Sequence, residues 1–241
     1  MQFNQWVRFR GISKMSISNA IKSLSKSATK TNQSSCNQRS TTIPTIKLVT
    51  NCSALRATDR VDWGKCGKEF DFISSPLSVH SSNGIQLKVS SRGTFLRLDA
   101  GSGLKGKFKS GDKLLFLEFA DSAITIDFST PVFGIGTQIQ RAFFGAFTGI
   151  IEAFDTTGKS LGRFKVRGND NHADDDIAPF IGVISPVPNI SRITLYVPEN
   201  GGYGFTINEL NLVTRLKKPI LARYLFLFNK NRTKSVNTDL M

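Results

Sequence analysis

The sequence has few of the residues that most often build catalytic and metal centres. Its 241 residues include two histidines, three cysteines, two tryptophans and three tyrosines. The cysteines form no Cys-x-x-Cys pair, and two histidines are too few for the usual zinc sites. No nucleophile and base stand together in a recognisable triad signature. We therefore expect a protein that is not an enzyme.

Long hydrophobic runs are also absent. The longest apolar stretch, 219–228, is interrupted by Arg223 and is shorter than the ~18 residues that a membrane-spanning helix needs. The N-terminal region lacks the continuous apolar core of a secretory signal peptide. These features predict no transmembrane span and give no evident signal peptide.

Acidic residues are scarce at both ends of the chain. Residues 1–60 contain ten Lys and Arg but a single acidic residue, and residues 214–241 contain seven Lys and Arg but a single acidic residue. The stretch 61–213 holds fifteen basic and sixteen acidic residues, so it is close to neutral. The excess positive charge of the chain, +14 in total, therefore belongs to its ends.

This charge pattern, together with the hydrophobic pattern, divides the chain into three parts. Residues 1–43 are rich in Ser, Thr and Lys and are predicted to be a disordered basic segment. Residues 44–213 are predicted to form one β-sandwich domain. Residues 214–241 are predicted to form a basic tail.

Within the predicted domain, short strand-like segments follow one another about every ten residues. Apolar and polar residues alternate within them, as at Ile126 and Phe128, which indicates half-buried antiparallel strands. The 19 phenylalanines suit an apolar seam between two sheets. We therefore predict an all-β, antiparallel, jelly-roll-like sandwich. The predicted strands after residue 122 are 123–128, 131–140, 147–155, 162–168, 178–185, 190–197 and 204–213.

Two finer predictions follow from the same alternation. Arg92-Gly93, between two alternating segments, is predicted to be a hairpin turn. Eight side chains are predicted to face the core: Ile126, Phe128, Phe164, Ile181, Ile193, Leu195, Phe205 and Ile207.

The loop 168–180 gathers carboxylates and is the one candidate metal site in the sequence. Its acidic residues are Asp170, Asp174, Asp175 and Asp176. Carboxylates so close together repel one another unless water or a cation such as Ca²⁺ compensates their charge. The spacing does not fit an EF-hand, because Ile181 stands where the final Glu would be. The alternatives are calcium binding by these four carboxylates, with no other cofactor, and an exposed polar turn that binds no metal.

Several segments resemble a domain of exported bacterial proteins. They include ATDRVDWGKCG, TPVFGIGTQIQ, IEAFDTTGKSLGRFKV, ADDDIAPFIGV and GFTINELNL. The domain is common in cyanobacteria and in proteins with a PEP-CTERM sorting tail, and the resemblance covers about residues 57–213. It implies a jelly-roll-like β-sandwich akin to carbohydrate-binding modules, located outside the cell or on its surface. It supplies no catalytic residue, and the sorting tail itself is not present.

The sequence thus favours a non-catalytic binding or surface-display module, with a glycan or other cell-surface polymer as partner. An alternative is an interaction protein whose basic ends contact anionic membrane or nucleic acid. Nucleic acid is the less favoured partner, because no Arg/Gly or Arg/aromatic pattern accompanies the charge. A hydrolase is a third and weaker hypothesis. Cys52 and Cys66 are compatible with either a disulfide or free thiols.

Overall fold

The predicted strands pair into two antiparallel sheets in the computed structural model, which describes residues 45–101, 107–118, 122–170, 177–198 and 204–216. The predicted terminal segments, 1–43 and most of 214–241, lie outside these residues. Among the described residues no helix has the length and apolar character needed to cross a membrane.

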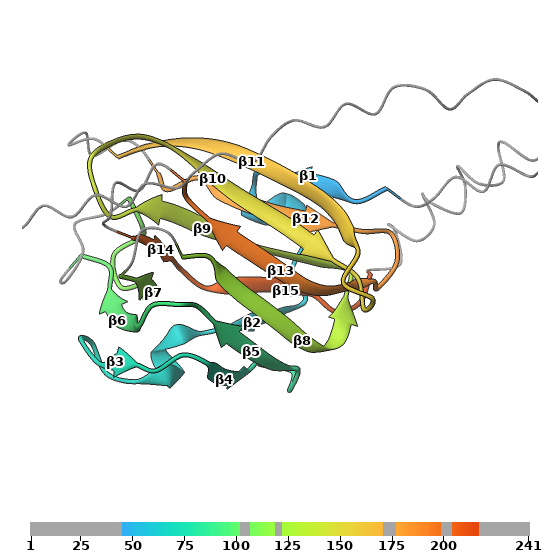
Figure 1. Ribbon diagram of the computed structural model, residues 1–241, viewed down its shortest axis with the longest axis horizontal. Helices are drawn as coiled ribbons and strands as arrows, with labels where there is room; N and C mark the ends of the chain where they lie inside the picture. The colour runs from blue at the N-terminus through green and yellow to red at the C-terminus, as the bar shows by residue number, and fades with distance from the viewer. Residues whose placement is uncertain (1–44, 102–106, 119–121, 171–176, 199–203, 217–241) are drawn as a thin grey trace, which may run out of the picture. The chain divides into compact units, whose positions relative to one another are not determined.

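One sheet has six strands in the order β11-β10-β13-β8-β5-β4, and these follow one another across Figure 1. All its pairings are antiparallel. Its strands are β4 (Leu77–His80), β5 (Gln86–Ser90), β8 (Ile124–Val132), β10 (Gly145–Phe154), β11 (Ser160–Asp170) and β13 (Ile190–Tyr196).

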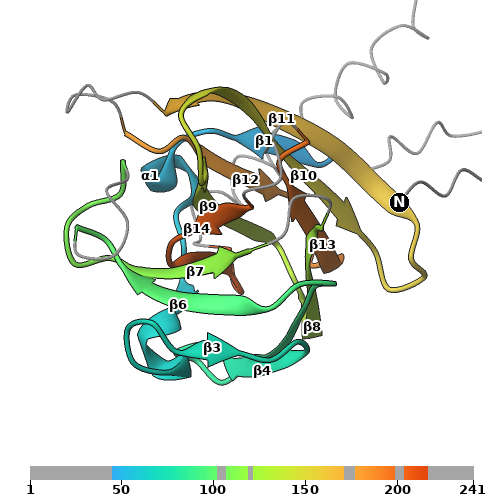
Figure 2. The ribbon, with the colours of Figure 1, turned by 60° about the vertical axis from the view of Figure 1, so that its left-hand side comes forward.

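The other sheet has nine strands, and its main path runs β1-β12-β9-β14-β7-β6-β3. Figure 2 shows β3, β6, β7, β14 and β9 in succession from bottom to top. The strands β2 and β15 lie off this path, since β15 pairs with both β2 and β9. The strands are β1 (Lys47–Val49), β2 (Asp59–Val61), β3 (Phe72–Ile73), β6 (Phe95–Asp99), β7 (Lys113–Leu117), β9 (Gly134–Arg141), β12 (Phe180–Ile184), β14 (Phe205–Ile207) and β15 (Leu210–Val213).

Successive strands repeatedly change sheet, as β8, β9 and β10 do, and this is how a jelly roll is wound. The result confirms the predicted all-β antiparallel sandwich. Two short helical turns complete the described structure: the α-helix α1 (Cys52–Leu55) and the 3₁₀ helix η1 (Trp63–Cys66).

Most of the buried apolar side chains of the described residues meet in one core, and two smaller clusters lie apart from it. In strands such as β5 and β8 every second side chain enters this core, whereas β9, β12 and β14 are buried along most of their length. The rings of Trp63, Phe95 and Phe205 are fully buried in the core. All eight side chains predicted to face inward belong to the core or pack against it. Phe164 is the only one of them that is partly exposed, because β11 is the edge strand of its sheet.

The predicted hairpin at Arg92-Gly93 is wrong. The strands on either side, β5 and β6, belong to different sheets, so this turn carries the chain from one layer to the other. The alternation identified both strands correctly. It could not assign their partners, because an inward-facing strand has the same pattern in either sheet.

The different depths of two phenylalanines lead to a stability prediction. Phe205→Ala should lower the free energy of unfolding by about 3–5 kcal/mol, since it empties a fully enclosed site. Phe164→Ala should cost clearly less, because its ring lies at the rim of the core. Denaturant unfolding of the two variants measures both effects. Equal losses would contradict this account of the core.

Candidate functional site

The last predicted strand, 204–213, is divided by a β-bulge, and the bulge creates the candidate site. β14 and β15 both lie along β9, with Ile207 opposite Ile139 and Asn211 opposite Gly136. Three residues of the bulged segment therefore stand against two residues of β9. The extra residue leaves Asn208 and Glu209 outside the regular pairing, and bulges of this kind redirect side chains next to functional sites.

The bulge also marks the place where the sheet changes partner. On the side away from β9, β14 pairs with β7 whereas β15 pairs with β2. The end of β2 and the start of β7 therefore flank a cleft of about 310 Å³ above the bulge. We name this the bulge cleft. Its lining residues are Cys52, Arg60, Asp62, Gly111, Asp112, Lys113, Gln138, Phe180, Asn208, Glu209 and Asn211.

Asn208 is the centre of the hydrogen bonds beneath the cleft. Its side-chain oxygen accepts from the backbone N–H of Gln138 at 2.9 Å, and so replaces a missing strand contact. Its amide nitrogen donates to Gln138 Oε1 at 2.7 Å and to Asp112 Oδ2 at 3.1 Å. The indole N–H of Trp63 donates to the Asn208 carbonyl at 2.7 Å. Through its side chain Asn208 thus joins β9 to the residue before β7, and through its backbone carbonyl it holds η1.

Glu209 lies beside Asn208, and the pKa of its carboxyl group is shifted from the usual value. Burial raises the pKa of its carboxyl group, and the nearby Asp62 and Asp112 add to the increase. Arg60 acts in the opposite direction, with its Nη1 3.4 Å from Glu209 Oε2. The Glu209 carboxyl group therefore holds its proton more tightly than an ordinary glutamate.

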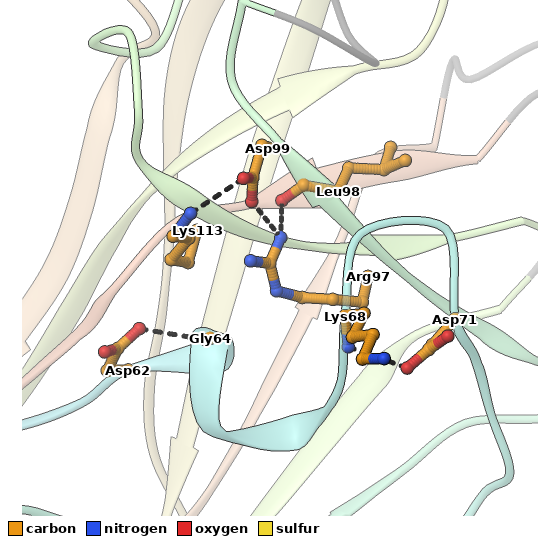
Figure 3. A network of polar contacts seen from close by, with 8 residues as sticks. All are labelled: Asp62, Gly64, Lys68, Asp71, Arg97, Leu98, Asp99 and Lys113. Atoms are coloured by element: carbon orange, nitrogen blue, oxygen red, sulfur yellow. Dashed lines mark hydrogen bonds and ion pairs between the residues drawn. The ribbon is translucent and has the colours of Figure 1, made fainter.

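The Lys113 ammonium group at the cleft is fixed by a neighbouring ion-pair network, shown in Figure 3. It donates to Asp99 Oδ2 at 2.7 Å, and the buried guanidinium of Arg97 contacts the other carboxylate oxygen. Lys113 and then Arg97 hold the pKa of the Asp99 carboxyl below its usual value. This network joins β6 and β7, next to η1, and it fixes the position of the Lys113 ammonium group.

Phe180 gives the cleft one aromatic surface. Its ring lies over two glycines that face each other on neighbouring strands, Gly136 and Gly182. A Cβ atom at Gly136 would come within 2.5 Å of the Phe180 ring, so only glycine allows this close approach.

The two described cysteines are free thiols, so the structure favours that alternative over a disulfide. Cys52 is exposed at the cleft. Burial and then the Glu209 carboxylate raise the pKa of its thiol, which makes it a poor nucleophile at neutral pH. Burial likewise raises the pKa of the Cys66 thiol, and Asp62 adds to that increase.

The predicted calcium residues are only partly within the described structure. Asp170 is buried at the end of β11, where it pairs with Gly145 in the sheet. Asp174, Asp175 and Asp176 lie outside the described residues. In the parts of the chain that the structure describes, no three His, Cys, Asp or Glu side chains are grouped to hold a metal ion. Calcium binding therefore stays a prediction.

None of the residues of the bulge cleft was predicted from the sequence as a site. They come from segments up to about 160 positions apart, so no local motif joins them. One signal was nevertheless present. The apolar residues move from odd positions, Phe205 and Ile207, to even positions, Leu210 and Leu212, and all four are buried. Such a shift of phase within a strand indicates a bulge.

Comparisons with known proteins give remote likenesses. The sequence matches no protein-family model and no curated protein. A DUF4465 family protein from Bacteroides caccae is 12% identical over 70% of this chain and all of that chain, with a TM-score of 0.39. CsCBM6-3 from Clostridium stercorarium, solved with cellobiose, is 13% identical over 62% and 98%, with a TM-score of 0.32. A tailspike protein 4 domain of bacteriophage CBA120 is 12% identical over 61% and 20%, with a TM-score of 0.26.

The raised pKa of Glu209 leads to a prediction about pH. Because the folded state favours the protonated carboxyl group, its contribution to stability is complete below the unfolded pKa of about 4.3 and is lost as the pH rises through the folded pKa. Glu209→Gln should therefore reduce the fall in melting temperature between pH 4 and pH 7. Glu118→Gln, at an exposed position, is the matched control. The same pH dependence in both variants would contradict the prediction.

Proposed function

We propose that the chain is a non-catalytic binding module whose bulge cleft takes a neutral carbohydrate. The observation that carries the proposal is the mixture of hydrogen-bonding groups in the cleft. Carboxylates accept, Arg60 and Lys113 donate, and the amides of Gln138, Asn208 and Asn211 do both. A sugar hydroxyl group is both a donor and an acceptor, so it needs neighbours of both kinds.

The charge balance of the cleft favours a neutral ligand over an anionic one. Two cationic side chains face three carboxyl groups, those of Asp62, Asp112 and Glu209. An anion would be repelled by these groups, whereas a polyhydroxylated neutral ligand can bridge them. Phe180, which is largely buried, is the one aromatic residue in a lining that is otherwise almost entirely polar.

The polar groups of the cleft are held by structural contacts, and this supports binding rather than catalysis. Asp62 accepts from the backbone N–H of Gly64 at 2.8 Å, and Asp112 accepts from Asn208. Preformed positions of this kind lower the entropy cost of binding. Display of the module at the cell surface, which the sequence resemblance implies, is part of the same proposal.

A hydrolase is the second candidate, and one observation favours it. Glu209 has a raised carboxyl pKa and shares the cleft with two further carboxyl groups, as the acid and base of glycosidases do. The ion pair of Glu209 with Arg60 makes this reading the weaker one, since the cation stabilises the charged form.

The test uses the full chain and a panel of neutral cello-, xylo-, manno- and galacto-oligosaccharides, with binding measured by calorimetry. For each panel member that binds, Arg60→Ala should weaken the affinity roughly tenfold or more, because a charged donor is lost from the site. Lys47→Ala, an exposed lysine on β1, is the control and should have no effect.

Two kinds of result would contradict the proposal, one from the binding measurements and one from an assay of hydrolysis. One is that no panel member binds, or that both variants bind as the wild type does. The other is the release of new reducing ends by the wild type but not by Glu209→Gln, which would establish the hydrolase instead.

A further inference from the structure

The outer face of the six-stranded sheet carries an excess of positive charge, although residues 61–213 as a whole are close to neutral in sequence. On the edge strand β11, Val166 points into the core, so Arg163, Lys165 and Arg167 point outward. All three are exposed. Alternate residues of a strand are about 6.8 Å apart, so these three cations form a regularly spaced row along the strand.

The positive charge is not confined to this edge. The strand register places Arg192 of β13 and Lys88 of β5 on the same outer face, where both lie opposite Asp127 of β8. Beyond them, Arg92 lines a shallow hollow of about 420 Å³ together with Ser90, Ser91, Ala123 and Thr125. Cations therefore occur from one side of the sheet to the other.

The acidic residues on this face are already engaged. The carboxylate of Asp127 accepts from Arg192 Nε at 2.5 Å, and that of Glu152 accepts from Ser160 Oγ at 2.7 Å. The Arg163 guanidinium lies 5.1 Å from the centre of the Tyr196 ring, as a cation–π contact. Between the charges stand the hydroxyl groups of residues such as Thr194 and Thr125, which pair across neighbouring strands.

We propose that this outer face, which we name the basic face, binds an acidic polysaccharide. The row on β11 offers regularly spaced cations to an extended anionic chain, and the threonine and serine hydroxyl groups can bond to its sugar hydroxyls. The arrangement suits a polysaccharide better than a nucleic acid. Single-stranded nucleic acid is held by aromatic stacking, and the Tyr196 ring on this face is already covered by Arg163.

This second site is independent of the bulge cleft. The cleft lies in the nine-stranded sheet and combines both signs of charge, whereas the basic face belongs to the other sheet. Its ligand class is also different, so either proposal can fail without the other.

The test compares two triple variants of the full chain, which removes the contribution of the basic ends from the comparison. One variant combines R163Q, K165Q and R167Q. The control combines K47Q, K65Q and K68Q, three exposed lysines of the other sheet and its connections, and removes the same charge. Binding to immobilised dextran sulfate and to polygalacturonate is measured at several salt concentrations.

The first variant should bind dextran sulfate roughly tenfold more weakly or worse, and the dependence of its affinity on salt should be flatter by up to about one unit of slope for each cation removed. The control should bind as the wild type does, and so should Arg60→Ala, which alters the cleft. If the triple variant loses the circular dichroism of the folded sandwich, the pair K88Q and K165Q provides the same comparison with a smaller change.

Three outcomes would overturn the proposal. Equal weakening in both triple variants would mean that net charge alone attracts the polymer. An absence of binding to both polymers at low salt would mean that the face has no such ligand. Tighter binding to single-stranded DNA, lost in the R163Q, K165Q and R167Q variant, would mean that the partner is a nucleic acid.

Discussion

A buried hydrogen bond from the Trp63 indole to the carbonyl of Asn208 fixes the part of the sheet on which the candidate site depends. The bulge between β14 and β15 leaves backbone groups without strand partners, and unpaired buried groups are costly. Trp63 satisfies the carbonyl, and the Asn208 side chain satisfies the N–H of Gln138. The fully buried Trp63 ring also secures η1 against the core. Without these contacts the bulge would leave buried polar groups unpaired, and the irregular strand would be less stable.

The cleft follows from this arrangement. On the side away from β9, a regular strand at 204–213 would pair along its whole length with one neighbouring strand. Such pairing would leave no space for a cleft between two neighbours. The extra residue instead turns Asn208 and Glu209 out of the ladder, at the point where β7 gives way to β2. The polar residues there are therefore fixed by the backbone and its hydrogen bonds, and this precision is what a binding site requires.

The sequence predicted the strands well and their partners poorly, for a physical reason. Burial on one face of a strand produces alternation, which is visible at Ile126 and Phe128 without knowledge of the neighbours. The choice of partner is set by contacts across the whole domain, and so the turn at Arg92-Gly93 was assigned to the wrong kind of connection. The cleft was missed because Arg60, Asp112 and Asn208 are brought together only by the pairing of distant strands. The near-zero net charge of residues 61–213 similarly hid the row of cations on β11.

The row of cations on β11 has a consequence for how copies of the protein meet. β11 is a long edge strand, and such an edge offers unpaired backbone groups to which the same edge of a second molecule can bond. Two copies joined in this way would bring Arg163, Lys165 and Arg167 of each chain close to those of the other, and their repulsion opposes the contact. An anionic polymer lying along the strand would neutralise that repulsion. The ligand would then act as a bridge, so that the solubility of the protein depends on the ratio of polymer to protein.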